Sequence, residues 1–173
     1  VKYNAVDANV YRSFGFPGWL YEIAYPCPGD RATAQMVAVM LERAGMEARL
    51  DPDRGLDHGV WVPLSLAFPE ATIPVIQVSL PLPSTPAMML RMGQALAPLR
   101  VEHILLVATG GIVHNLARLQ PDMDTPFPEP WAAEFDGWVR EKVGALDAEA
   151  LAGYPALAPH AHAAVPTTEH FDP

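Results

Sequence analysis

The order of apolar segments along this chain limits the folds that it can adopt. Residues 73–80 and 103–109 are short, apolar and rich in β-branched side chains, which is typical of strands covered on both faces. A further short strand is expected at 46–50. Segments with helical periodicity separate these strands. The alternation predicts an α/β fold with three layers, in which a central, mostly parallel or mixed sheet is flanked by helices.

Four helices are predicted around this sheet. Asp30 is a candidate N-cap for the first, which would end near Gly45 and carry an apolar face of Ala34, Val37, Ala38 and Leu41. The next two are expected over residues 60–68 and 85–99. The fourth is expected over 127–145, with an inner face of Trp131, Phe135, Trp138 and Val139.

Composition narrows the class of protein. A chain of 173 residues with 50% hydrophobic and 18% charged residues fits one domain over 1–173. The net charge of −9, with only 11 Lys and Arg, argues against a nucleic-acid partner. Cys27 is the single cysteine, so no internal disulfide is expected, and a packing role is favoured for it. No apolar run reaches the roughly 18 residues of a membrane span, and we expect a cytoplasmic protein with no membrane partner.

Two histidines lie in settings that favour chemistry. His58 belongs to a Gly-Leu-Asp-His-Gly loop, and His114 follows a predicted strand end and the pair Gly110-Gly111. Ligands of open α/β sheets bind beyond the carboxyl ends of strands, and glycines there permit sharp turns and close approach. A neutral imidazole can exchange a proton or bind a metal near pH 7. For either histidine alone, a buried side chain satisfied by hydrogen bonds is an equally good interpretation.

At these residues the chain resembles the class III extradiol ring-cleavage dioxygenases, a LigB-like family, and in particular the DOPA 4,5-extradiol type. The shared segments span nearly the whole chain in the family's order. The most specific are Asp57-His58-Gly59 and the terminal Pro166-Thr167-Thr168-Glu169-His170. The others are Phe14-Gly15-Phe16-Pro17 with Leu20-Tyr21, Tyr25-Pro26-Cys27-Pro28-Gly29-Asp30, Pro74-Val75-Ile76-Gln77-Val78-Ser79, and the Gly-Gly-Ile-Val-His-Asn-Leu run that ends at Leu116.

The resemblance implies roles for individual residues. It implies a non-haem metal, Fe(II) or in isolated protein zinc, with His170 as a ligand. His114 corresponds to the catalytic acid/base histidine, which is sometimes also counted as a ligand. His58 corresponds to a second catalytic histidine beside the substrate, where Trp61 and Asn115 are further candidates for binding it. The implied partners are a catechol and O₂, and the protein is expected to be a monomer or homodimer. We expect the imidazoles of His58, His114 and His170 to converge on one site.

The chain departs from the family in its metal ligands. The family supplies two further histidines from a His-Gly-x-Pro loop and a Ser-x-His-Trp turn, and neither motif occurs in this sequence. The chain also starts at Val1 and stops at Pro173, shortly after the Glu-His pair. We therefore expect a partial catalytic domain that lacks an N-terminal ligand segment and a C-terminal tail, and that is inactive by itself. A smaller departure is at Arg12 and Ser13, where members of the family tend to carry an acidic and an aromatic residue.

Alternative sites and functions remain open at this point. His160 and His162 have the alternating spacing that places two imidazoles on one side of a strand, although they lie in an Ala/Pro-rich loop. His103 is expected at the surface. No Gly-x-Ser-x-Gly, Walker or Gly-x-Gly-x-x-Gly motif occurs. The alternatives to a dioxygenase are a metal-binding relative that serves recognition and a hydrolase that uses zinc-activated water.

Overall fold

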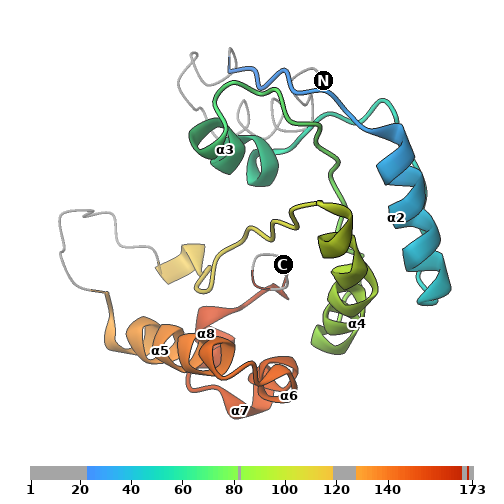
Figure 1. Cartoon of the computed structure of the whole chain (residues 1–173). Coiled ribbons are helices and arrows are strands. Elements are labelled where there is room, and N and C mark those ends of the chain that lie inside the picture. The colour runs from blue at the N-terminus through green and yellow to red at the C-terminus, as the bar shows by residue number, and fades with distance from the viewer. Residues whose placement is uncertain (1–22, 82, 119–127, 169–170, 172–173) are drawn as a thin grey trace. The chain divides into compact units, whose positions relative to one another are not determined.

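Helices dominate the computed structural model, which describes residues 23–81, 83–118, 128–168 and 171 (Figure 1). The chain divides into two compact units, Val1–Ser79 and Leu80–Pro173. The described helices of the first unit are α2 (Arg31–Arg43) and α3 (His58–Ala67). Those of the second are α4 (Pro86–Leu96), the 3₁₀ helices η2 (Ala97–Glu102) and η3 (Leu116–Arg118), α5 (Pro130–Gly144), α6 (Ala148–Ala152), α7 (Tyr154–Leu157) and α8 (Ala161–Ala164). None of these described helices is long and apolar enough to cross a membrane.

The predicted central sheet is wrong for the part of the chain that the structure describes. Residues 46–50, 73–80 and 103–109 form no strand, and among the described residues only Leu56 takes part in a bridge. The Val75 N–H donates to the Pro28 carbonyl at 2.9 Å, but this bond is not continued into a ladder. A strand is stable only when a neighbouring strand pairs with its backbone groups. Apolar, β-branched composition favours such a strand without supplying its partner, and Leu105 is consequently 70% exposed.

The first predicted helix is confirmed, together with its cap. α2 begins after Asp30, whose Oδ1 accepts from the Ala32 and Thr33 N–H groups at 3.0 and 3.1 Å. The Thr33 hydroxyl donates to Asp30 Oδ2 at 2.6 Å, and these bonds hold the pKa of Asp30 below its usual value. Val37 and Leu41 are buried, as the apolar spacing predicts. Gly45, with φ +78°, turns the chain away after the helix.

The core of the first unit surrounds Cys27. The buried residues of this cluster, which we call the Cys27 cluster, are Tyr25, Cys27, Leu56, Trp61 and Ala71. Cys27 is fully buried, so the predicted packing role is confirmed. The Tyr25 hydroxyl donates to the Phe68 carbonyl at 2.8 Å. Trp61 joins α3 to this cluster, so the first turn of α3 is anchored to the core while His58 at its start remains exposed.

Alkaline pH is expected to destabilise this core. Burial raises the pKa of the Cys27 thiol and, together with the nearby Cys27, that of Tyr25. Both folded groups therefore keep their protons at pH values where the unfolded chain loses them. Stability is fully present below the unfolded pKa values, about 8.5 for Cys and 10 for Tyr, and is lost as pH rises through the raised folded values.

Denaturant unfolding between pH 7 and 10 measures this effect. We expect the unfolding free energy to fall above about pH 8.5. The unfolding free energy of Cys27→Ala should fall less steeply over the same range. This variant is already less stable at pH 7, because the substitution leaves a small cavity. Equal slopes for the wild type and the variant would contradict the role assigned to the buried thiol.

In the second unit, one predicted helix is shorter than expected. α4 begins after Thr85, whose hydroxyl oxygen accepts from the Met88 N–H at 3.2 Å, and buries Met92 and Leu96. The α-helix ends at Leu96, and residues 97–102 continue as η2. Pro98 explains the change, because it has no N–H with which to extend the α-helical hydrogen bonds. His103 closes η2 in the left-handed region, at φ 58°, and is exposed as predicted.

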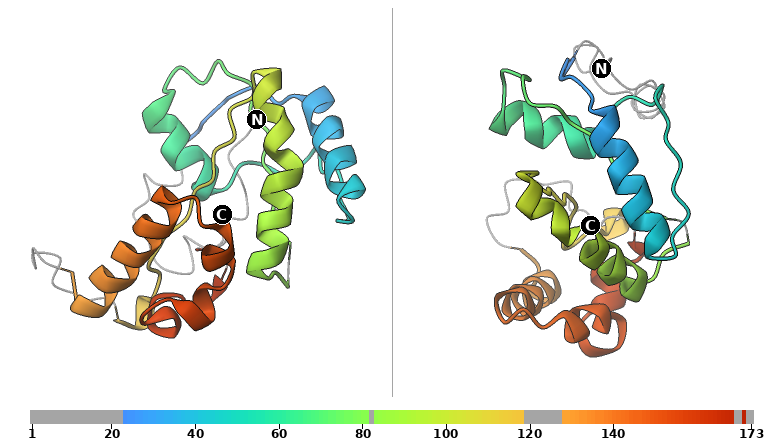
Figure 2. Two further views of the ribbon diagram at one scale, coloured as in Figure 1. Left: turned by 60° about the horizontal axis from the view of Figure 1, so that its bottom comes forward. Right: turned by 45° about the vertical axis from the view of Figure 1, so that its right-hand side comes forward.

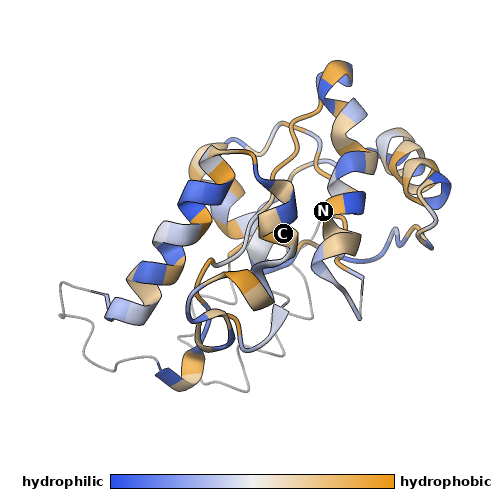
Figure 3. Ribbon diagram, turned by 90° about the horizontal axis from the view of Figure 1, so that it is seen from below, coloured by the Kyte–Doolittle hydropathy of each residue, from blue (hydrophilic) through white to orange (hydrophobic). Residues whose placement is uncertain are grey.

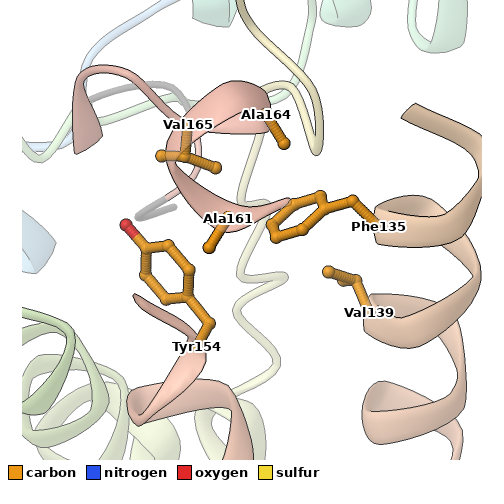
Figure 4. Packing of buried hydrophobic residues seen from close by; sticks show 6 residues of the cluster. All are labelled: Phe135, Val139, Tyr154, Ala161, Ala164 and Val165. Carbon is orange, nitrogen blue, oxygen red and sulfur yellow. The ribbon is translucent and has the colours of Figure 1, made fainter. Parts of the chain in front are cut away.

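A second hydrophobic cluster joins the C-terminal helices, and we call it the Phe135 cluster. Its buried residues are Phe135, Val139, Tyr154, Ala161, Ala164 and Val165 (Figure 4). Figure 4 shows Phe135 and Val139 of α5 directed toward α8, as the predicted inner face requires. α6 contacts both α4 and α5 (Figure 2). The helices carry both hydrophilic and hydrophobic residues around their circumference (Figure 3). This packing builds the surface on which the His114 segment rests.

Candidate functional site

His58 is the first residue of α3 and is exposed. The helix therefore begins two residues earlier than predicted, so that His58 belongs to its first turn and not to the loop before it. Asp57 precedes it in an extended conformation, and its carbonyl accepts from the Val60 and Trp61 N–H groups, both at 3.0 Å. Trp61, one turn later, is 6% exposed. The backbone that carries His58 is thus held between a hydrogen-bonded start and a buried anchor.

Gln77 is a residue of this region that the sequence did not single out. Its Nε2 donates to Asp57 Oδ2 at 2.8 Å, and its Oε1 accepts from the Asp57 N–H at 3.0 Å. Asp57 and Gln77 both belong to the first unit, and both hydrogen bonds between them are partly buried. The only signal in the sequence is that Gln77 is one of two polar residues, with Ser79, inside the apolar segment 73–80. The spacing of 20 residues to Asp57 hides the partner.

His114 is fixed through its backbone in the second unit. Its N–H donates to the Ala164 carbonyl of α8 at 2.9 Å, and the side chain is partly buried. The next residue, Asn115, donates from Nδ2 to the Ala163 carbonyl at 2.7 Å. Val113 packs against the Phe135 cluster. Two consecutive residues therefore attach the His114 segment to consecutive carbonyls of α8.

The glycines before His114 do not adopt a backbone conformation that requires glycine. Among the described glycines only Gly45 has a positive φ, so Gly110 and Gly111 are not in the left-handed region. A Cβ added at Gly111 would lie 3.5 Å from the Val113 carbonyl oxygen, which is an ordinary contact. The turn after residue 109 thus does not require glycine at 111 for backbone reasons.

Loss of the Asn115 amide should loosen this attachment. Asn115→Ala leaves the Ala163 carbonyl without that donor, and we expect a loss of about 1–2 kcal/mol in unfolding free energy. Leu116→Ala is the matched control, since Leu116 is 67% exposed and should change stability by about 0.5 kcal/mol or less. Denaturant unfolding of both variants tests the difference. Equal losses would mean that the amide bond has no part in holding the segment.

Arg118 and Trp131 form a contact that the sequence also did not reveal. The Arg118 guanidinium carbon lies 5.2 Å from the centre of a Trp131 ring, and the Trp131 indole N–H donates to Glu129 Oε2 at 2.7 Å. Trp131 is partly buried, as its place on the inner face of α5 predicts. The contact joins η3, directly after the His114 segment, to the start of α5.

The predicted ligand His170 lies outside the described residues. Its described neighbours are Thr168 and Phe171, and the Phe171 N–H donates to the Thr168 carbonyl at 3.0 Å. The Phe171 ring centre is 4.4 Å from that of Tyr154 and 5.7 Å from that of Phe135. Phe171, which follows the predicted ligand in the sequence, therefore packs on the Phe135 cluster.

His160 and His162 do not lie on a strand. His160 precedes α8 in the left-handed region, and His162 belongs to α8. Residues two apart on a helix do not face one another, so the alternative of a chelate on one side of a strand does not hold. The expected Ala/Pro-rich loop is also corrected, because His162 lies in α8. His160 Nε2 lies 3.0 Å from Glu134 Oε2 of α5, and both side chains are largely exposed. Pairs of this kind contribute little to stability.

Within the described part of the chain, no three His, Cys, Asp or Glu side chains gather closely enough to hold a metal ion. The described residues by themselves therefore do not form a metal centre. His58 belongs to the first unit and His114 to the second. The convergence of His58, His114 and His170, and the substrate roles of Trp61 and Asn115, stay predictions.

Comparison with known proteins gives a consistent result. Residues 3–173 match the family described as the catalytic LigB subunit of aromatic ring-opening dioxygenase. The chain is 38% identical over 173 residues to the 4,5-DOPA dioxygenase extradiol of Beta vulgaris, a match that covers 98% of this chain and 64% of the relative. The protein of the same name from Escherichia coli is 37% identical over 165 residues, which cover 92% of this chain and 59% of the relative.

A second plant protein with the same name is similar to this chain to about the same degree. The 4,5-DOPA dioxygenase extradiol of Mirabilis jalapa is 35% identical over 162 residues, covering 91% of this chain and 58% of the relative. The chain thus spans about three fifths of the length of these relatives. Dioxygenases of this family are metal-dependent. Because the family match extends over nearly every residue, the chain belongs to the LigB family of aromatic ring-opening dioxygenases.

Proposed function

We propose that the protein containing this chain is an oxidoreductase, an extradiol dioxygenase that inserts O₂ into the ring of a DOPA-like catechol. The observation that carries the proposal is the family match over residues 3–173. Relatives that bear the name 4,5-DOPA dioxygenase extradiol, from plants and a bacterium, support the substrate class. The proposal includes a cytoplasmic location and a monomer or homodimer.

The proposed metal is Fe(II), with His170 as one of its ligands. Catechol and triplet dioxygen react slowly by themselves, and bound iron supplies the electronic coupling between them. The described residues do not by themselves assemble a metal centre, and the roles proposed for His114 and His58 are to move a proton and to stabilise charge. Zinc in place of iron could not support this redox chemistry.

His114 is proposed to move the proton. A catechol carries two hydroxyl protons, and ring cleavage needs the second removed and later returned to an oxygen of the reacting group. A positioned imidazole does both near pH 7. The bond from the His114 N–H to Ala164 supports this role, because it fixes the backbone from which the ring projects.

His58 is proposed to stabilise charge. Its place in the first turn of α3 is exposed, so a substrate can approach the imidazole from solvent. By donating a hydrogen bond to a catechol oxygen, it would favour the charge that develops there during the reaction. The buried Trp61 supports this role, because it anchors the same helical turn to the Cys27 cluster.

The proposal is tested on the product of the complete open reading frame that contains this sequence. The purified protein is loaded with Fe(II) without oxygen, mixed with L-DOPA or catechol, and exposed to air while oxygen uptake and the visible spectrum are followed. We expect oxygen uptake and a yellow ring-opened semialdehyde product. The same protein loaded with zinc is the control and should remain colourless.

Other outcomes identify the alternatives. Metal binding without turnover of any catechol in a panel would replace the dioxygenase with a recognition protein. Hydrolysis of an ester or amide substrate with zinc but not with iron would indicate a hydrolase. Either result would overturn the proposed activity.

A further inference from the structure

Asp57 and Gln77 form a two-point clamp in the first unit. The Gln77 amide donates to the Asp57 carboxylate at 2.8 Å and accepts from the Asp57 backbone N–H at 3.0 Å. The pair is separated by 20 residues and is partly buried. We call it the Asp57–Gln77 clamp.

The chemistry of the clamp is specific to an amide side chain. The carboxylate requires a donor and the backbone N–H requires an acceptor, and both belong to the same residue. Among side chains of this length, only that of glutamine offers a donor and an acceptor side by side without charge. A carboxylate at 77 would lack the donor, and an apolar side chain would lack both groups.

The clamp acts at the residue before His58. An aspartate at the N-cap commonly accepts from the first N–H groups of its helix. Here Asp57 makes no such bond, and its carboxylate is held by Gln77 instead. Its N–H binds Gln77 and its carbonyl accepts from Val60 and Trp61, so the N–H, the side chain and the carbonyl of Asp57 are all held.

We propose that Gln77 is a positioning residue that sets the orientation of the His58 imidazole through Asp57. This inference rests on the proposed function of His58. The clamp holds one end of the turn and the buried Trp61 the other, with the exposed His58 between them. Displacement of a catalytic group by about 1 Å can reduce a rate by about 10²-fold, so loss of the clamp affects the reaction without direct contact between Gln77 and the substrate.

Three variants separate geometry from charge. Gln77→Met has nearly the same length and removes both hydrogen bonds, while the charge of Asp57 remains. Asp57→Asn removes that charge but keeps an oxygen to accept from Gln77 and a backbone N–H to donate to it. Gln94→Met is the matched control, because Gln94 is an exposed glutamine of α4 in the second unit.

The readouts are kcat and KM for catechol with the iron-loaded complete protein, and the NMR signals of the His58 ring without substrate. We expect Gln77→Met to move or broaden the His58 ring signals, to leave those of His114 in place, and to lower kcat about 10- to 100-fold with a smaller change in KM. Gln94→Met should retain the wild-type kcat and KM. Asp57→Asn, which can keep both hydrogen bonds to Gln77, should leave the His58 ring signals close to those of the wild type and lower kcat less than Gln77→Met does. If Gln77→Met does not fold, Gln77→Glu takes its place, since it keeps the acceptor and should disturb the His58 signals likewise.

The result that overturns the inference is an unchanged set of His58 ring signals in a folded Gln77 variant, together with an unchanged kcat. An equal loss of kcat in Asp57→Asn would assign the effect to charge and also overturn the positioning role. If the wild type cleaves no catechol, the proposed function fails, whereas the His58 ring signals still decide whether the clamp orients the imidazole.

Discussion

Replacing His114 by glutamine in the complete, iron-loaded protein is expected to lower kcat for catechol cleavage by a factor of about 10²–10⁴, the usual contribution of a positioned general acid/base. Glutamine retains hydrogen-bonding capacity but cannot exchange a proton near pH 7. The backbone bond from residue 114 to the Ala164 carbonyl does not depend on the side chain, so the fold should persist. Rates are measured by oxygen uptake over a range of pH.

His103→Asn is the matched control for this prediction. His103 is an exposed histidine of the same unit with φ 58°, a conformation that asparagine tolerates well. Its activity should remain near wild type. Iron content of each variant distinguishes the two roles considered for His114, because loss of iron would indicate a ligand, and retained iron with lost activity an acid/base. Full activity in iron-loaded His114→Gln would refute both.

The largest loss of stability is expected for Phe135→Ala. Phe135 is fully buried, and its ring lies 6.4 Å from Tyr154 and 5.7 Å from Phe171, centre to centre. Truncation removes this packing and leaves a cavity, which costs about 3–5 kcal/mol of unfolding free energy. Because the Phe135 cluster supports α8, the His114 amide that binds the Ala164 carbonyl should also exchange faster with solvent.

Val143→Ala provides the comparison on the same helix. Val143 is 53% exposed, so its truncation should change the unfolding free energy by about 0.5 kcal/mol or less. Denaturant unfolding and amide hydrogen exchange of both variants measure the effect. A loss below about 1 kcal/mol for Phe135→Ala would show that the site collapses around the missing ring and that the cluster is not a rigid support.

Helices were predictable because their signals are local. Asp30 and Thr85 cap α2 and α4 with bonds to N–H groups two or three residues away, and the spacing of Phe135 and Val139 defines the inner face of α5. Boundaries differed where a nearby residue intervened, as Pro98 does after α4. Such contacts can be read from a short window of sequence.

The candidate site was only partly predictable. The motifs around His58 and His114 singled out both residues, and the family resemblance that they carried is confirmed. The Asp57–Gln77 clamp was not found, because hydrogen-bond partners 20 residues apart leave no periodic signal. The attachment of Asn115 to Ala163 spans 48 residues and was likewise invisible.

By itself, the sequence determined the presence of α2, α3, α4 and α5, the Asp30 cap and the buried positions of Val37, Leu41, Phe135 and Val139, and its short motifs identified the family. It did not predict the short helices α6, α7 and α8. The tertiary structure alone decided which backbone groups pair. The segments 73–80 and 103–109 have the composition of strands, yet they form none within the described residues, whereas the carbonyls of Ala163 and Ala164 receive the His114 segment. The physical reason is that side-chain periodicity reports what a segment can bury, while a backbone hydrogen bond requires a partner that only the folded chain brings near.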